Sequence, residues 1–383
     1  AGVLQTNINA SGNDYLAATA ITAAMLDEIN YTQAVDTLIL CHEDLQTQRL
    51  VRLSDTSWLL ASLPITNIPA YAWTPVASNP AATLTPSAVA GNITVTASAG
   101  VFTASAASYV GQHIYINPFG TLRIIEKKST TVLKCFAEVG LFNTDVVASG
   151  EWDLETGWED SWSVARGWPR SATFHEGRLY FGGSKQRQNT IWGSRVIDYF
   201  NFDLGTALDD EAVESTINTD QFNAITHIVS GNVMRVFTTG AEFVVSQDGS
   251  NPITPASFLV RPQTRLGSKP GVPIEDLNGA VIFVQRQGRS LNAFQYTDTS
   301  ASYAVQPISV LSSHLMKDPI DLAVRRATST DETDTIYLVN GDDGTMTVYS
   351  VLASQAVVAA TEFVTDGEFL AVGVELSDVY TIV

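Results

Sequence analysis

The stretch GWPRSATFHEGRLYFGGSKQRQNTIWGSRVIDYFNF, from Gly167 to Phe202, is the most informative part of this sequence. It contains two β-hairpin signals, in which short runs of β-branched and aromatic residues are separated by glycine turns such as HEGR and FGGS. It has two tryptophans and no signature of a nucleophile, a metal site or a nucleotide site. The stretch therefore predicts a β-sheet unit with an architectural role.

Four segments repeat this pattern of two apolar strands joined across a turn. Their second turns centre near Gly183, Gly240, Gly288 and Asp343, at intervals of 57, 48 and 55 residues. Periods of about 40 to 50 residues with several strands per unit are typical of β-propeller blades, whose faces must be covered by neighbours. The uneven spacing leaves a meandering β-sandwich as an alternative. The segment 37–60, with its strand, turn, strand, strand pattern, is a candidate for a further blade.

Two other regions differ from these repeats. Residues 17–30 show helical spacing of apolar side chains, with Thr19 or Thr22 as candidate caps, and are the only helix we expect. Residues 64–90 are nearly uncharged and rich in Pro, Ala, Thr and Ser, which is typical of a linker at a domain boundary. Five strand-like runs follow and predict a small antiparallel sandwich or barrel: NITVTA, GVFTAS, GQHIYIN, TLRIIEKK and TVLKCFAEV.

We therefore expect an all-β fold, an irregular β-propeller with an inserted small β-sandwich or barrel domain. Residues 1–65 should contain the N-terminal helix and the first propeller strands. Residues 66–160 should form the inserted β-rich domain, and residues 161–383 the remaining blades.

The composition limits the classes of partner. The 383 residues include 21 Lys and Arg against 40 Asp and Glu, a formal net charge of −19, which disfavours tight or sequence-specific nucleic-acid binding. The charge could equally serve only to keep the chain soluble. Apolar runs such as Ala280–Val284 are far shorter than the roughly 20 residues that cross a bilayer, so we expect no membrane-spanning segment. Cys41 and Cys135 lie in strand-like runs and should be reduced core residues, not a disulfide.

The best candidate for acid–base or metal chemistry is the carboxylate cluster Asp209, Asp210, Glu211 and Glu214. Two carboxylates could serve a glycosidase if they faced each other across a sugar-binding cleft. The segment lacks the pattern of an EF-hand calcium loop. We expect a solvated acidic loop or a subunit-facing patch, and not a catalytic site.

The other polar motifs are weaker. NGDDG, from Asn340 to Gly344, predicts a hairpin turn in preference to a calcium loop, because Asn-Gly and Asp-Gly tolerate positive φ. The five histidines lack the paired spacing of zinc sites, and GGSK is too short for a phosphate-binding loop. His175 beside Glu176 could act as a general base or be ordinary turn polarity. We therefore expect no catalytic residue, no cofactor and no metal.

Five of the seven tryptophans fall within 41 residues. They could stack on sugars or bases, but no basic residues are interleaved with them as nucleotide stacking would require. We expect these five to pack between the inserted domain and the propeller: Trp152, Trp158, Trp162, Trp168 and Trp192.

The stretch from Gly167 to Phe202 also resembles the central signature of tail nozzle proteins, or tail tubular protein B, of short-tailed, podovirus-type bacteriophages. The similarity covers roughly residues 20–65 and 160–325. Family members usually begin with an additional β-rich region and continue past the propeller, so we expect this chain to be truncated at its C-terminus. Four further segments match in order: YTQAVDTLILCHEDLQTQRLVRLSDTSWLL, DDEAVESTINTDQFNAITHIVSGNVMRVFTTGAEFVVS, PITPASFLVRPQTRLGSKPGVPI and GAVIFVQRQGRSLNAFQYT.

The resemblance implies a structural virion protein, assembled in the host cytoplasm as a homo-hexameric tail tube through which the genome is ejected. Its partners would be the tail adaptor protein of the head-to-tail connector and tail fibres, while DNA passes without specific binding. Six copies, each of charge −19, would carry about −114, and acidity on the channel wall would repel phosphate and let DNA slide. The carboxylate cluster would then contribute to the lumen or to subunit contacts. The alternatives are a host-surface glycan-degrading enzyme and a receptor-binding tail protein.

Overall fold

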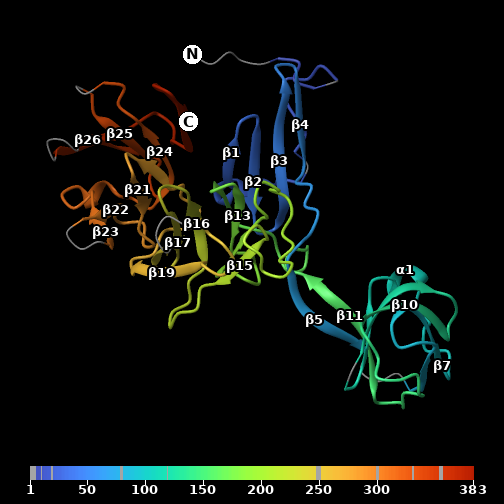
Figure 1. The fold of residues 1–383 in the computed structure, drawn as a ribbon. Coiled ribbons are helices and arrows are strands. Elements are labelled where there is room, and N and C mark those ends of the chain that lie inside the picture. Colours follow the sequence, from blue (N-terminus) through green and yellow to red (C-terminus); the bar gives the residue numbers. More distant parts are fainter. Residues whose placement is uncertain are drawn as a thin grey trace. The chain divides into compact units, whose positions relative to one another are not determined.

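The computed structural model describes residues 6–9, 11–18, 20–77, 81–118, 120–246, 252–298, 302–329, 332–352 and 357–383. The chain divides into two compact units, one formed by residues 1–69 and 162–383 and the other by residues 70–161. Both consist almost entirely of antiparallel β-sheets, so the all-β prediction is confirmed (Figure 1). Within the ranges described, no helix is long and apolar enough to span a membrane.

The first unit contains five four-stranded sheets, each joined in sequence order as an antiparallel meander, and we call them blades 1 to 5. A two-stranded terminal hairpin follows blade 5. The strands are, for blade 1, β1 (Asn30–Ala34), β2 (Thr37–His42), β3 (Leu45–Ser54) and β4 (Ser57–Ser62); for blade 2, β12 (Ser171–His175), β13 (Arg178–Gly182), β14 (Thr190–Gly193) and β15 (Val213–Thr216); for blade 3, β16 (Ile225–Val229), β17 (Met234–Thr238), β18 (Glu242–Ser246) and β19 (Leu259–Thr264); for blade 4, β20 (Glu275–Leu277), β21 (Ala280–Val284), β22 (Leu291–Thr297) and β23 (Ser302–Pro307); for blade 5, β24 (Pro319–Arg325), β25 (Asp334–Asn340), β26 (Met346–Leu352) and β27 (Val357–Phe363); and for the terminal hairpin, β28 (Ala371–Glu375) and β29 (Asp378–Ile382).

The blades pack face to face around their first strands. Strand β1 lies beside β12, β12 beside β16, β20 beside β24, and β24 beside β28. The cores lie between neighbouring blades: Tyr180 of blade 2 shares a buried cluster with Ile225 of blade 3, and Leu291 of blade 4 shares one with Leu338 of blade 5. A single sheet cannot bury both of its faces, so each blade depends on its neighbours. This arrangement is the predicted irregular β-propeller.

First strands of neighbouring blades run in the same direction. At the ends of β12 and β16, Nδ1 of His175 lies 2.9 Å from Oγ of Ser230. At the starts of β24 and β28, the N–H of Val372 donates to Oδ2 of Asp321. The turns between first and second strands, and between third and fourth strands, therefore lie at one end of the propeller. We call this end the turn face and the other end the opposite face.

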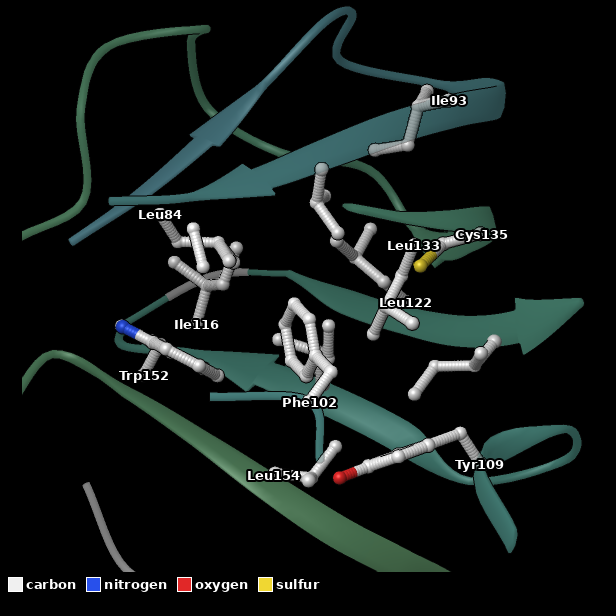
Figure 2. Close-up of a cluster of buried hydrophobic side chains, with 14 of the residues drawn as sticks. Leu84, Ile93, Phe102, Tyr109, Ile116, Leu122, Leu133, Cys135, Trp152 and Leu154 are labelled. Carbon is white, nitrogen blue, oxygen red and sulfur yellow. The ribbon is translucent and has the colours of Figure 1, made fainter. Parts of the chain in front are cut away.

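The second unit is the inserted domain, one seven-stranded antiparallel sheet in the order β5-β11-β8-β9-β10-β7-β6. Its strands and short helix are β5 (Ala70–Ala77), β6 (Leu84–Pro86), β7 (Gly91–Ala97), α1 (Ala106–Tyr109), β8 (His113–Ile116), β9 (Thr121–Lys127), β10 (Val132–Val139) and β11 (Trp152–Asp160). The sheet curls around its own hydrophobic core, which Figure 2 shows with Phe102 and Trp152 in contact with aliphatic side chains from several strands.

One of the five strand-like runs in this domain is not a strand. GVFTAS, residues 100–105, is irregular and leads into α1. The side chain of Phe102 is fully buried in the core, and its N–H donates to the carbonyl oxygen of Thr130 over 2.9 Å. Core packing of one large side chain therefore anchors this segment, where the alternation of residues had suggested a sheet ladder.

The prediction of a helix over residues 17–30 was wrong. A 3-10 helix, η1, covers only Ala23–Glu28, and Thr22 at its N-cap makes no side-chain hydrogen bond. None of its residues is buried and Leu26 is 62% exposed, so tertiary packing does not stabilise an α-helix that is too short to persist alone. Asn30 instead begins β1, and Thr19 lies outside the described residues.

The uncharged segment 64–90 is also not a simple linker, because it contains β5 and β6. Strand β5 pairs with β11, which lies about eighty residues later in the sequence, and β6 pairs with β7. The fourth strands of blades 2 to 5 were likewise not predicted, because they are short or largely exposed. Strand pairing over long sequence distances thus sets these elements.

The two cysteines are free and buried, one in each unit, which confirms the prediction of unpaired core residues. Burial raises the pKa of Cys135 to about 12 and also raises that of Cys41. Both thiols therefore stay protonated near neutral pH and are unreactive as nucleophiles.

Candidate functional site

Four aromatic residues of the signature stretch, Trp168, Phe181, Trp192 and Phe202, lie in the core between blades 1 and 2. Trp162, just before the stretch, is 1% exposed and makes edge-to-face contacts with three rings. The ring centroids lie 5.3 Å away for Phe181, 5.3 Å for Trp192 and 5.0 Å for Phe202. Such geometry is favourable for aromatic pairs and leaves none of these rings free to stack on a ligand.

The tryptophans do not pack as expected between the two units. Trp152 belongs to the core of the inserted domain, and its indole N–H donates to the carbonyl oxygen of Ala82 over 2.8 Å. Trp162, Trp168 and Trp192 belong to the propeller core. Each of these four therefore stabilises its own unit. The side chain of Trp158 lies outside the described residues.

Arg178 holds the long loop between β14 and β15, residues 194–212, which we call the β14–β15 loop. The residue is 1% exposed, and its guanidinium donates to the carbonyl oxygens of Ser194 (2.6 Å), Asp209 (2.6 Å) and Glu211 (2.5 Å). The planar guanidinium can serve several acceptors at fixed angles, which an ammonium group cannot. One buried cation thus ties both ends of this loop to β13.

The four predicted carboxylates do not form one patch. Asp209 and Asp210 are exposed on the β14–β15 loop, and Oδ2 of Asp210 lies 3.6 Å from Nη2 of Arg195. Glu211 is buried, and its Oε2 accepts the N–H groups of Thr206 (2.7 Å) and Leu208 (2.8 Å). The Glu211 carboxylate therefore closes the turn inside the loop.

Glu214 is also used internally. Its Oε1 accepts a hydrogen bond from Nη1 of Arg187 over 2.6 Å, and its Oε2 accepts the indole N–H of Trp192 over 2.9 Å. Two of the four carboxylates are thus exposed and two hold the blade together. In the part of the chain that the structure describes, no group of three or more His, Cys, Asp or Glu is placed to hold a metal ion.

A cavity of about 400 Å³ lies among the first strands of the blades, and we call it the axial cavity. Residues of β1, β12, β16 and β20 line it, including Tyr31, His227 and Glu275, together with Arg326 just after β24. Each of these strands is the first of its sheet, so one edge carries N–H and C=O groups with no partner strand. The walls of the axial cavity can therefore bind water or a polar ligand. No pattern in the sequence indicates this cavity, because the lining residues are scattered over nearly 300 positions.

Acidic groups dominate one side of the axial cavity. Desolvation by the cavity walls raises the pKa of Tyr31, and the carboxylates of Glu275 and Asp321 add to the effect. Burial likewise raises the pKa of Glu275, with Arg326 opposing the shift and Asp276 and Asp321 adding to it. Tyr31 therefore stays a neutral phenol, since both influences oppose the phenolate that a nucleophilic tyrosine would need.

On another side of the axial cavity, blades 1 and 2 are joined by an ion pair. Nε of Arg170 donates to Oε2 of Glu43 over 2.7 Å, and the N–H of Trp168 donates to the Glu43 carbonyl oxygen over 2.8 Å. Glu43 follows β2, and Trp168 precedes β12, so the end of β2 and the start of β12 lie together. The turn between β1 and β2 therefore belongs to the turn face.

His227 should make the stability of the propeller pH-dependent. Desolvation lowers its pKa from 6.5 to about 4, so the unfolded chain takes up the proton at a higher pH than the folded chain does. Stability is therefore full above about pH 6.5 and falls as the pH drops towards 4, with a loss of about 2 kcal/mol between pH 7 and pH 5. Urea unfolding at both pH values should show this loss for the native chain and a smaller one for His227→Gln. His314→Gln, at an exposed histidine, should keep the native pH dependence.

The remaining sequence candidates have structural roles. NGDDG forms the turn between β25 and β26, as predicted, and the amide of Asn340 donates to Thr345 Oγ1 (2.9 Å) and Thr347 Oγ1 (3.0 Å). The imidazole of His175 is held against Ser230 of the next blade, and burial lowers its pKa. Both residues therefore connect strands or blades.

No family model and no curated protein matches this chain. Solved structures with distant similarity include the following three. An auxiliary nutrient binding protein from Bacteroides thetaiotaomicron has a TM-score of 0.32 and 9% identity, with 74% of this chain and 71% of that one covered. A protein from Lactobacillus plantarum has a TM-score of 0.37 and 12% identity, with 92% and 87% covered, and the endosialidase of phage phi92 has 0.27 and 9%, with 88% and 56% covered. At these TM-scores and identities, none of the three similarities assigns the chain a function.

Proposed function

We propose that this chain is a structural subunit of a bacteriophage tail nozzle, which assembles with copies of itself into a ring or tube through which the genome leaves the virion. The role is one of architecture, without catalysis. The stretches that resemble tail tubular protein B, residues 20–65 and 160–325, coincide with blades 1 to 4 and the start of blade 5, and they exclude nearly all of the inserted domain.

The observation that carries the proposal is the way the signature stretch uses its polar groups. The guanidinium of Arg178 donates hydrogen bonds to three backbone carbonyl oxygens. The carboxylate of Glu214 accepts hydrogen bonds from Arg187 and Trp192. The bonds of Arg178 fix the β14–β15 loop on the turn face, and those of Glu214 join β15 to β14 and to the turn between β13 and β14. A stretch whose charged side chains form internal hydrogen bonds, and so hold a loop in place, suits a subunit that must present a fixed surface.

Asp209 and Asp210 are the members of the carboxylate cluster that we propose for the channel wall or for subunit contacts. Both are exposed on the turn face, whereas Glu211 and Glu214 hold internal bonds. Together with the net charge of −19, they would repel DNA phosphates at short range, so that DNA slides without being bound. The other partners would be the tail adaptor protein and tail fibres, in a tail assembled in the host cytoplasm.

Negative-stain microscopy with mass photometry of the purified chain tests this proposal. We expect rings with a central hole and a mass close to six subunits at micromolar concentration. Monomers at every concentration would contradict it. Tubes whose outer wall carries Asp209 and Asp210 would leave the nozzle role in place and exclude their part in the channel.

A second candidate function, binding of a host-surface glycan, is favoured by the axial cavity. Tyr31 lines it together with Glu275 and His227, and the Glu275 carboxylate lies close enough to help raise the pKa of the Tyr31 phenol. An aromatic face with hydrogen-bonding groups around it suits a neutral saccharide, while the acidic side of the cavity disfavours an anionic one.

Calorimetric titration with neutral and sialylated oligosaccharides decides between the two roles. The nozzle role predicts no binding by the native chain. Binding of a neutral saccharide that Tyr31→Ala and Glu275→Gln both abolish, but that Asp209→Ala retains, would establish the second role. Hydrolysis of the saccharide that is lost in Asp209→Ala or Glu214→Ala would instead establish an enzyme.

A further inference from the structure

Three aliphatic residues on the turn face combine backbone strain with exposure. Val35, Ile197 and Leu376 have φ angles of 54°, 65° and 55°, and their exposed fractions are 88%, 77% and 88%. The left-handed region is unfavourable for bulky side chains, above all for β-branched ones. An exposed aliphatic group contributes almost nothing to the folding of the isolated chain, so neither feature is explained by the stability of the subunit.

The same turns elsewhere in the chain show that the strain is avoidable. The turn between β20 and β21 has Asn278 with φ 55°, followed by Gly279, and the turn between β12 and β13 has Glu176 followed by Gly177. Asn and Gly are the residues that such two-residue hairpin turns favour. Val35 and Leu376 occupy the equivalent positions between β1 and β2 and between β28 and β29. Val35 and Leu376 are therefore aliphatic at the position where blade 4 has Asn278 and blade 2 has Glu176.

Ile197 is held in place by the folded blade. Its N–H donates to the carbonyl oxygen of Gly177 over 2.8 Å, and the N–H of neighbouring Val196 donates to that of Asp210 over 3.0 Å. Two residues later, the ring of Tyr199 packs edge-on against Phe174, with centroids 5.4 Å apart. Ile197 is thus presented from a fixed loop, and its strain is imposed by bonds around it.

Unpaired carboxylates lie beside two of the three aliphatic residues, whereas Asp36, which follows Val35, is already paired with Arg52. Asp198 follows Ile197, Glu375 precedes Leu376, and Asp209 lies on the same loop as Ile197. In the described part of the chain, none of these three carboxylates has a cationic side chain as a partner. A partner for this surface should therefore combine apolar contacts with positive charge.

The opposite face of the same propeller has those properties. Between β21 and β22, Arg286 and Arg289 are exposed, and among the described residues no carboxylate pairs with either. Between β23 and β24, Val310 and Leu311 are 63% and 95% exposed. Arg289 lines a surface hollow together with residues of that second connection, among them Lys317 and Asp318, so its side chain lies beside the connection that carries Val310 and Leu311.

We propose that the turn face is the docking surface for a second copy of this chain, which binds through its opposite face. Val35, Ile197 and Leu376 make the apolar contacts, and the carboxylates beside the last two pair with Arg286 and Arg289 of the next copy. The interface is heterologous, so repetition gives a ring if the rotation closes and a filament if it does not. The assignment rests on the proposed self-assembly and names the surface that performs it.

Substitution by asparagine separates docking from folding. Asparagine tolerates positive φ, so Val35→Asn and Ile197→Asn should leave the melting temperature of the monomer unchanged or raise it. Each should weaken self-association about tenfold, as measured by sedimentation velocity over a concentration series. Val146→Asn is the matched control, because Val146 is 60% exposed in the inserted domain without positive φ, and it should associate as the native chain does.

Mixing two variants tests the head-to-tail geometry. A Val35→Asn/Ile197→Asn chain lacks a working turn face, and an Arg286→Glu/Arg289→Glu chain lacks a working opposite face. Each variant alone should be monomeric at concentrations where the native chain associates. An equimolar mixture should form heterodimers and nothing larger, because one intact turn face meets one intact opposite face.

Three results would overturn the docking surface: native association in the asparagine variants, no heterodimer in the mixture, or a native chain that is monomeric throughout. Rings that persist in the Val35→Asn/Ile197→Asn chain would refute this interface and leave the nozzle role standing. Native filaments or dimers that use these two faces without closing into rings would support this interface and contradict the nozzle role.

Discussion

Arg178→Met should lower the free energy of unfolding by about 3 to 5 kcal/mol. Methionine fills a similar volume but leaves three carbonyl oxygens, at Ser194, Asp209 and Glu211, without their donor. When buried carbonyl oxygens lose a charged donor, the free energy of their desolvation is no longer offset by a hydrogen bond. Water can replace the donor only if the β14–β15 loop opens. Urea unfolding followed by tryptophan fluorescence measures the loss, since Trp192 lies at the end of the strand that leads into this loop.

Two further variants make this prediction specific. Arg178→Lys should be nearly as damaging, because one ammonium cannot reach three acceptors in the fork of a guanidinium. Arg52→Met should have little effect, because Arg52 is exposed and its ion pairs with Asp36 and Asp55 are screened by solvent. If Arg178→Met unfolded with the native midpoint, the guanidinium would not be what holds the loop.

Trp162→Ala should be the second large effect, again about 3 to 5 kcal/mol, because it empties the centre of a fully packed aromatic core. A finer comparison concerns phenylalanine. The indole nitrogen of Trp162 is buried and has no hydrogen-bond partner among the described residues, whereas that of Trp192 donates to Glu214. Trp162→Phe should therefore cost less than Trp192→Phe, which leaves a carboxylate oxygen of Glu214 without its donor.

Thermal and urea unfolding of the three variants provide the test. Trp58→Phe is the matched control, since Trp58 lies in β4 outside this core and should change the unfolding midpoint only slightly. Equal losses for Trp162→Phe and Trp192→Phe would show that the hydrogen bond to Glu214 adds nothing to stability. A Trp162→Ala chain as stable as the native one would contradict the role of this core in joining blades 1 and 2.

The repeats of the propeller could be predicted because their signals are local. Each hairpin from SATF to TMTVYS combines apolar alternation with a turn residue, and those elements appear as β12 and β13, β16 to β18, β21 and β22, and β25 and β26. The elements that were not predicted correctly are those that depend on contacts with residues far away in the sequence. Strand β5 exists through its pairing with β11, and the expected helix at 17–30 fails because no neighbouring surface covers Leu26. Local periodicity contains neither kind of information.

The candidate sites show the same division more sharply. The cluster at Asp209 and Glu214 was visible as a run of carboxylates, but the sequence could not show that Glu214 faces Arg187 and Trp192. The axial cavity had no sequence signal at all. The strained turn residues were also invisible, because Val35 and Leu376 look like ordinary strand residues until their φ angles are known.

An all-β chain with repeated hairpins, an inserted sheet and a net charge of −19 could be predicted from the sequence alone, because strand alternation, turn chemistry and charge are properties of neighbouring residues. The tertiary structure was needed to show which charged groups are bonded internally and which face solvent. It brought the first strands together around the axial cavity and placed Val35, Ile197 and Leu376 at one end of the propeller. These arrangements depend on the packing of blades against each other, and contacts between residues far apart in the sequence set that packing.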